Sequence, residues 1–182
     1  MTRKNKDMAP IGDGCQLFPP WGAPDQWREA NAALNHLMAI HDKKLNSAIE
    51  AARAIGDRLK WLFPLLDTLC DETCPHCPDP CCLSAKIWVD FKDLLFLHLA
   101  GHPVPQVQLI ADTGSRCTCI SHRGCTLPRL SRPWVCTWYL CPAQTARLRR
   151  RPASNQTLFR DTVLSIKSLR NRMEQDFIQA VR

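Results

Sequence analysis

Five cysteines lie within thirteen residues of this chain, between Cys70 and Cys82. A second group of cysteines follows between Cys117 and Cys141, interspersed with prolines and a glycine. Cysteine thiolates bind zinc and iron, and two cysteine-rich loops separated by a helix can bring such ligands together from distant parts of one chain. We therefore predict a metal centre held by thiolates.

The first loop contains a Cys-x-x-Cys turn, formed by Cys74 and Cys77. Such a turn offers two thiolates to one ion, and its amides can donate hydrogen bonds to the sulfurs. Cys81 and Cys82 are adjacent, and adjacent side chains point apart in both helix and strand, so they seldom face one ion together. Either one large cluster spans the loop, or two centres share it. Both alternatives need the downstream thiols as well.

The cellular compartment decides between metal ligands and disulfides. The sequence has neither a recognisable secretory signal nor an apolar run long enough to span a membrane. We therefore expect a cytoplasmic protein with reduced thiols, most of which bind metal. Cys15 is far from the other cysteines and is predicted to be a free thiol. A disulfide framework is the alternative if the protein is secreted.

The net charge gives only weak information about partners. The formal value is +7, but it counts every cysteine as neutral. Eight thiolates around two dipositive centres would leave about +3, so a nucleic-acid partner is not indicated. The basic cluster of Arg147, Arg149, Arg150 and Arg151 is interpreted as a solvated linker.

A long amphipathic helix is predicted from Asp25 to Phe63, because apolar residues recur there at helical spacing. Such a helix would be almost 60 Å long at about 1.5 Å per residue, so it must break or project. Gly56 is a candidate kink, and Pro64 should end the helix. The helix either packs against the body or offers a seam to a protein partner or a second copy of the chain.

Two further helices are predicted. The first runs from Phe91 to Ala100, with Asp90 as its N-cap and Gly101 at its end, and Asp93 is interpreted as a charge on its surface. A short strand at 106–110 follows. The last helix is capped by Ser154 or Asn155, runs to Val181 and is expected to lie along the long first helix.

These elements predict a mainly α fold, in which a long N-terminal helix and a C-terminal helix flank an irregular cysteine-rich metal-binding core. The predicted organisation is a flexible Pro/Gly-rich arm at 1–24, a long helical segment at 25–69, a cysteine-cluster metal-binding domain at 70–145, and a basic linker with the C-terminal helix at 146–182.

The cysteine spacing resembles that of a known family. The run Cys74-Pro-His-Cys-Pro-Asp-Pro-Cys-Cys82 is similar to the C-x-x-C-x-x-x-C-C signature of the YkgJ-like cysteine-cluster proteins, which chelate zinc or iron. Cys119, Gly124-Cys125 and the block from Arg132 to Cys136 resemble the second half of the family pattern, with Cys141 as its last member. The resemblance covers roughly residues 70 to 145.

This resemblance implies a set of metal ligands: Cys74, Cys77, Cys81, Cys82, Cys119, Cys125, Cys136 and Cys141. Cys70 and Cys117 are then peripheral, and His76 and His122 are interpreted as hydrogen-bonding neighbours of the ligands. A [4Fe–4S] cluster is favoured because its cube offers several iron corners to a crowded loop. Zinc, or one centre of each kind, is the alternative, because zinc also accepts four thiolates.

The activity is less well defined than the cofactor. The first hypothesis is an accessory, electron-carrying or metal-delivery component for a protein partner bound by the long helix. The alternative is a metal-dependent redox or protein-modifying enzyme, since the family that the chain resembles includes flagellin lysine methylases. No Ser-His-Asp grouping, phosphate loop or acid pair stands out in the sequence.

Overall fold

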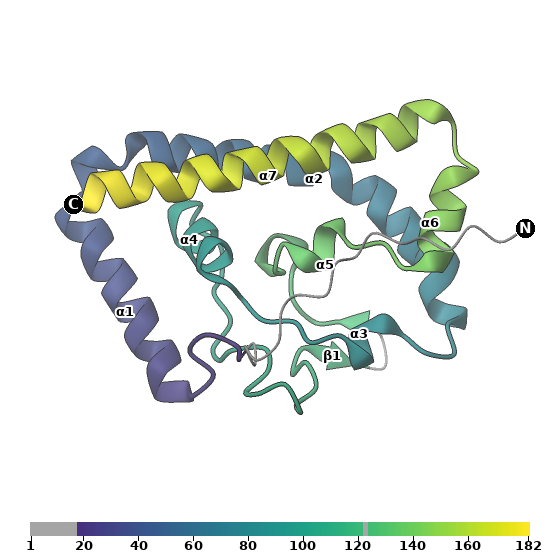
Figure 1. Ribbon diagram of the computed structural model, residues 1–182, viewed down its shortest axis with the longest axis horizontal. Coiled ribbons are helices and arrows are strands. Elements are labelled where there is room, and N and C mark those ends of the chain that lie inside the picture. Colours follow the sequence, from purple (N-terminus) through teal and green to yellow (C-terminus); the bar gives the residue numbers. More distant parts are fainter. Residues whose placement is uncertain (1–17, 122–123) are drawn as a thin grey trace, which may run out of the picture.

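The computed structural model describes residues 18–121 and 124–182. Most of the predicted arm, including Cys15, lies outside the described residues, as does His122. The described part of the chain is mainly α-helical, as predicted, and its longest helices lie along one edge of the molecule (Figure 1).

The helices are α1 (Pro24–Ile40), α2 (Asn46–Thr73), α3 (Cys81–Ser84), α4 (Phe91–Leu99), α5 (Val135–Trp138), α6 (Pro142–Arg149) and α7 (Ala153–Val181). Short 3-10 turns lie at Asp42–Lys44, Cys74–His76 and Arg129–Ser131. Strands β1 (Ile120–Ser121) and β2 (Gly124–Cys125) form an antiparallel pair in which Ile120 lies opposite Cys125.

The long N-terminal helix predicted from the sequence is in fact two helices. The chain turns between Ile40 and Asn46, and Leu45 at this turn is buried in the core. The turn allows both helices to bury apolar residues within one body, which a straight rod could not do. Gly56 lies inside α2 and does not end it.

Pro64 does not end the helix either, because α2 continues to Thr73. A proline inside a helix removes one backbone hydrogen bond. Here Leu62, Leu66 and Leu69 are buried on both sides of Pro64, and this burial holds the helix together across the missing bond.

Helix α7 lies antiparallel along α2, which confirms the predicted pairing (Figure 1). Ser47 Oγ donates to Asp176 Oδ2 at 2.7 Å near one end, and Arg58 Nε donates to Ser165 Oγ at 2.7 Å nearer the middle. Small and apolar side chains fill the space between the helices: Ala48, Ala51, Ala52, Ile55, Ile166, Met173 and Phe177. The predicted cap at Ser154 or Asn155 is wrong, because Pro152 precedes the first turn.

Helix α4 starts and stops where the sequence predicts. The Asp93 amide donates to Asp90 Oδ1 at 2.7 Å, and Gly101 has a φ of 67° just beyond the helix. The prediction that Asp93 is a surface charge is wrong, because its side chain is buried against Arg170.

The predicted strand at 106–110 does not form. The buried side chain of Gln108 instead forms hydrogen bonds with backbone groups, as a neighbouring strand would have done. Its Oε1 accepts from the Val89 amide at 2.8 Å, and its Nε2 donates to the Val89 carbonyl at 3.0 Å and the Pro20 carbonyl at 2.9 Å. One amide side chain thus satisfies backbone groups of two segments.

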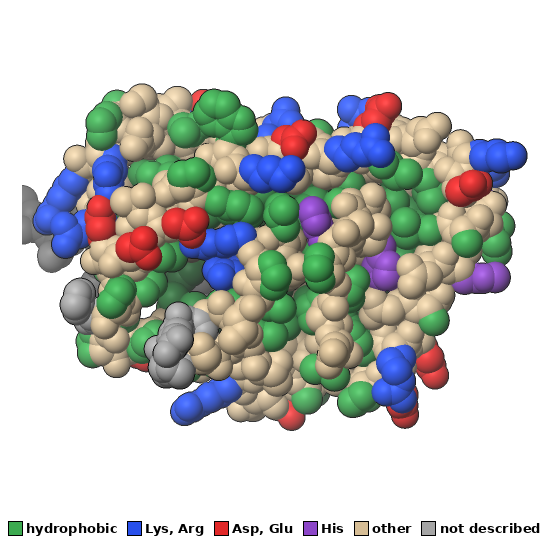
Figure 2. All heavy atoms as spheres, turned by 180° about the vertical axis from the view of Figure 1, so that it is seen from behind, with side chains coloured by type: hydrophobic (Ala, Val, Ile, Leu, Met, Phe, Trp, Pro, Cys, Tyr) green, Lys and Arg blue, Asp and Glu red, His purple; other side chains and the backbone are tan. Residues whose placement is uncertain are grey.

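None of the helices within the described ranges combines the length and apolar character that a bilayer crossing demands. On the face shown in Figure 2, Lys and Arg side chains are interspersed with Asp and Glu side chains. This face therefore presents no continuous surface of one charge.

Candidate metal centre

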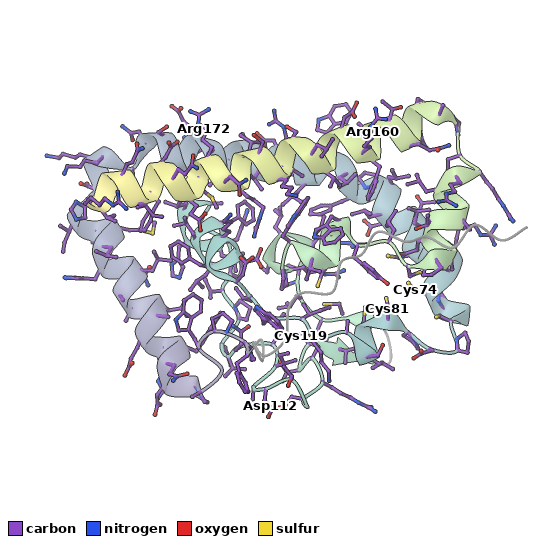
Figure 3. The ribbon with its side chains drawn as sticks, in the orientation of Figure 1. Cys74, Cys81, Asp112, Cys119, Arg160 and Arg172 are labelled. Atoms are coloured by element: carbon purple, nitrogen blue, oxygen red, sulfur yellow. The ribbon has the colours of Figure 1, made fainter. Side chains whose placement is uncertain are left out.

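The ends of several short elements place the cysteines. Cys70 is in the last turn of α2, and Cys74 begins the turn that follows it. Cys81 and Cys82 open α3, while Cys141 is the N-cap of α6. In Figure 3, Cys74 and Cys81 lie next to each other near the end of α2, and Cys119 lies farther away. Cys141 of the second segment lies with the first segment's thiols, because Gln144 contacts Cys141, Cys70 and Cys74.

One set of thiols, which we call the first thiol group, consists of Cys70, Cys74, Cys77, Cys81 and Cys141. Burial raises the pKa of Cys74, and the neighbouring Cys70 and Cys81 add to this effect. Burial also raises the pKa of Cys81, and Cys141 contributes more to that shift than Cys77 does. The closeness of Cys81 to Cys141 joins the two cysteine-rich segments.

Gln144 supplies hydrogen-bond donors to the first thiol group. Its Nε2 lies 3.4 Å from Cys70 Sγ and 3.8 Å from Cys74 Sγ, and its backbone N–H donates to Cys141 Sγ at 3.5 Å. Its Oε1 accepts from the Cys141 amide at 3.3 Å, so the side chain is fixed at both ends. Gln144 is buried, and its hydrogen-bond partners include the sulfur atoms of three cysteines.

Arg129 is a second donor to Cys70, with Nη2 at 3.8 Å from the sulfur and an ion pair to Asp67 on the other side. Burial lowers the pKa of Arg129, but hydrogen bonds to Cys70 and Asp67 outweigh that effect and raise it. The guanidinium therefore stays charged beside the thiol.

The sequence interpretation did not identify Gln144 or Arg129. For Gln144 a signal was available, since Cys141-Pro-Ala-Gln144 has the spacing of a capping box with cysteine in the place of serine or threonine. For Arg129 there was none, because its partners Asp67 and Cys70 are about sixty residues away in the sequence.

The remaining described thiols, Cys82, Cys117, Cys119, Cys125 and Cys136, form what we call the second thiol group. Burial raises the pKa of Cys136 to about 12, with further contributions from Cys125, Cys82 and Cys117. Burial raises the pKa of Cys82 to about 12 as well, with contributions from Cys81, Cys74 and Cys125. The Thr126 amide donates to the Cys119 carbonyl at 2.8 Å, which holds this side of the group together.

The two groups meet at Cys81 and Cys82, whose thiols lie within hydrogen-bonding reach of each other. Cys81 is also influenced by Cys141, and Cys82 is influenced by Cys74 of the first thiol group and, less strongly, by Cys125 of the second, so the two groups adjoin each other. Cys70 and Cys117, interpreted from the sequence as peripheral, lie within the two groups. All ten cysteines in the described ranges are free thiols.

The described thiols lie near one another, but they are not arranged around a common centre. Across residues 18–121 and 124–182, no set of three or more His, Cys, Asp or Glu side chains is arranged so that it could hold a metal ion. The donor chemistry fits a soft metal, because sulfur is the ligand that zinc and iron–sulfur clusters prefer. Coordination requires metal–sulfur distances near 2.3 Å and loss of the thiol protons, so binding would draw the sulfurs together.

A buried ion pair fixes the segment that carries Cys136. Arg170 on α7 donates to Asp93 on α4 at 2.7 Å, and the Trp134 amide donates to the same carboxylate oxygen at 3.0 Å. The Arg170 guanidinium also lies over the Trp134 ring, 5.9 Å from its centroid. Burial raises the pKa of Asp93 to about 6, although Arg170 acts in the opposite direction. The second thiol group is thus anchored to the helical body.

Comparison with known proteins gives no assignment. No family model, curated protein or solved structure matches the chain. The similarity to the YkgJ-like cysteine-cluster proteins is therefore a prediction based on cysteine spacing.

Proposed function

We propose that this chain is a cytoplasmic metal-binding protein whose cysteines hold a [4Fe–4S] cluster or zinc, and that it serves a protein partner as an accessory, electron-carrying or metal-delivery component. The observation that carries the proposal is that Gln144 joins thiols of both cysteine-rich segments: its Nε2 lies 3.4 Å from Cys70 Sγ, and its backbone N–H donates to Cys141 Sγ at 3.5 Å.

The surroundings of the thiols support the proposal. Gln144 and Arg129 aim N–H donors at Cys70 and Cys74, and such donors stabilise negative charge on sulfur. Thiolates are the form that binds metal. When bound, a [4Fe–4S] cluster would supply one-electron transfer, whereas zinc held by four thiolates would supply structural stability.

The partner proposal rests on α2. Its apolar face is covered by α7, so the seam expected from the sequence is used inside the molecule. The side chain of Trp61 on α2 is 74% exposed, and that of Leu164 on α7 is 57% exposed. We assign the partner or second copy to this outer surface of α2 and α7.

Metal and sulfide analysis of anaerobically purified protein tests the proposal. Protein that holds a [4Fe–4S] cluster is brown, absorbs broadly at about 400 nm and contains equal amounts of iron and acid-labile sulfide. Colourless protein with stoichiometric zinc supports the zinc form. Cys15→Ser serves as a control, because this thiol is remote from both cysteine groups in sequence. Purified wild-type protein with neither metal, and no uptake of either on reconstitution, contradicts the proposal.

A further inference from the structure

Helices α6 and α7 form the two walls of an open cleft, which lies where α6 meets the beginning of α7 and has a volume of about 570 Å³. Its lining includes Thr145 and Arg149 from α6, and Gln156, Thr157 and Arg160 from α7. In Figure 3, Arg160 lies on the half of α7 that is nearer α6. Sites for small molecules typically have volumes of roughly 300–1,000 Å³, so the cleft is large enough for one.

Both guanidinium groups of the cleft are available to a ligand. Arg149 is exposed, and its side chain makes no ion pair or hydrogen bond within the described residues. Arg160 uses only its Nε, which lies 2.9 Å from Asp161 Oδ1 in an exposed pair of the kind that contributes little. Among the described residues that line the cleft, none is Asp or Glu. The two walls therefore present two positive charges without a negative charge in the lining.

The link between α6 and α7 is held in place by its own contacts. Gln156 Nε2 donates to the backbone carbonyl of Arg149 at 3.3 Å and to that of Arg151 at 3.1 Å. The side chain of Arg151 pairs with Glu72 of α2, which ties the link to the helical body. Because these contacts hold the two walls together, a ligand would not have to order them on binding.

The chemistry of the lining favours a ligand with phosphate groups. A guanidinium group offers paired N–H donors to phosphate oxygens, and it is always charged in proteins. Thr157 is exposed, and its hydroxyl has no hydrogen-bond partner within the described residues, so it can donate to a further oxygen. Two cations on facing walls match a chain of several phosphates better than one phosphate ion, because each cation then meets its own negative charge.

We propose that the cleft between α6 and α7 binds a small oligophosphate, with Arg149 and Arg160 holding its phosphate groups from opposite walls. This class includes inorganic tripolyphosphate and the phosphate chain of a nucleoside triphosphate. A small ligand is favoured over nucleic acid, because Arg147 and Arg150, which are also exposed, do not line the cleft and Arg151 is paired with an acid. The inference goes beyond the proposed function and needs no metal.

Calorimetric titration of the full-length protein with inorganic tripolyphosphate tests the proposal. The wild type should bind one tripolyphosphate per chain. Arg149→Gln and Arg160→Gln should each weaken binding by about tenfold or more, because each removes a charge-assisted hydrogen bond. A parallel titration with ATP identifies the source of the phosphates: tighter binding of ATP assigns a nucleotide, and equal binding assigns the phosphate chain alone.

Arg147→Gln is the matched control. It removes the same charge from an exposed residue of the same helix, outside the lining of the cleft. At about 0.1 M salt, where exposed charges interact over only about 10 Å, it should weaken binding by less than about threefold. Thr157→Val keeps the size of the side chain and should weaken binding by about threefold or more, because it removes a hydrogen-bond donor. Far-UV circular dichroism and thermal unfolding should show that all variants fold as the wild type does.

Three outcomes would overturn the inference. The first is a wild-type protein without saturable binding of tripolyphosphate. The second is equal weakening by Arg147→Gln and Arg149→Gln, which would show a diffuse attraction to the whole basic segment. The third is binding of a single-stranded oligonucleotide that tripolyphosphate does not displace, which would make the segment a nucleic-acid surface. The metal content of the protein enters none of these measurements, so their failure would leave the proposed function unaffected.

Discussion

Arg170 and Asp93 form a buried ion pair 77 residues apart in sequence, with Nη1 of the guanidinium 2.7 Å from Oδ1 of the carboxylate. Both side chains are less than a tenth exposed. The same oxygen accepts the Trp134 amide, so the pair connects α4, α7 and the segment leading to Cys136. Its removal should therefore affect both the helical body and the second thiol group.

Arg170→Met should lower the free energy of unfolding at pH 7 by about 3 kcal/mol, because it leaves the Asp93 carboxylate buried without its cation. Arg170 lowers the pKa of Asp93, so this pKa should rise further in the variant. Protonation then relieves the buried charge, and the deficit should shrink as the pH falls towards 5. Chemical denaturation at several pH values measures this deficit.

Arg172→Met is the control. It loses an exposed pair with Asp176 and should change the free energy of unfolding by less than about 1 kcal/mol. An equal loss in both variants contradicts the prediction.

The wild-type protein should show a related pH dependence. Burial raises the folded-state pKa of Asp93 to about 6, above the ordinary value of 3.8. The folded state then binds more protons than the unfolded state between these values. The stability contributed by this group is complete below about pH 3.8 and is lost as the pH rises through about 6.

Asp93→Asn isolates that contribution. The unfolding free energy of the wild type minus that of the variant should fall as the pH rises from 4 to about 6, because the wild type alone loses the contribution of Asp93. The difference should then level off. Thermal or urea unfolding of both proteins across pH 4–8 provides the comparison. A difference that does not change over this range would show that Asp93 has no raised pKa in the folded protein.

Metal affinity should rise with pH. Burial raises the pKa values of Cys82 and Cys136 to about 12, so both are protonated thiols at neutral pH in the metal-free protein. Each must release its proton to bind metal, and the apparent affinity then increases by up to about tenfold per pH unit for each such ligand. Calorimetric titration with Zn²⁺ in buffers of different ionisation enthalpy counts the released protons. Binding without proton release would mean that these thiols are not ligands.

Two glycines should respond to alanine in opposite directions. Gly101 has a φ of 67°, and a Cβ there would meet no atom within 4 Å, so Gly101→Ala should cost about 1 kcal/mol through backbone strain alone. Gly56 is inside α2, where a Cβ would approach only His102 Nε2 at 4.0 Å. Gly56→Ala should therefore stabilise the protein by roughly 0.5–1 kcal/mol. Urea midpoints measure both changes, and stabilisation by Gly101→Ala would contradict the backbone explanation.

Self-association through α2 should depend on Trp61, whose side chain is largely exposed. The weight-average mass of the wild type in sedimentation should rise with concentration, whereas Trp61→Lys should stay monomeric, because a charge replaces the apolar contact. Lys60→Glu is a control for a charge change at a neighbouring exposed position. If the wild type is a strict monomer at all concentrations, a different protein must be the partner of this surface.

The sequence was sufficient where the signal was local. Asp90 and Gly101 mark the two ends of α4, and the apolar spacing after residue 153 predicts α7 and its pairing with the N-terminal helices. Local signals were misleading at Pro64, because burial of leucines on both sides outweighs one lost hydrogen bond.

What the sequence did not reveal depends on distant partners. Asp93 lies in the first turn of α4, where an acidic residue is usually exposed. Only the folded structure shows that it pairs with Arg170, 77 residues away. Cys70 precedes the recognised cysteine motif, and only the arrival of Gln144 and Arg129 connects it with the other thiols. The grouping of Cys82 with Cys125 and Cys136 likewise needs three segments to be folded together.

Helix α2 ends at the first thiols, and α6, which carries Cys141 and Gln144, leads through a short link into α7. The two longest helices are therefore both connected to the first thiol group: α2 carries Cys70 in its last turn, and α7 follows α6, whose N-cap is Cys141. A sliding motion of α7 along α2 would change the separation between Cys70 and Cys141.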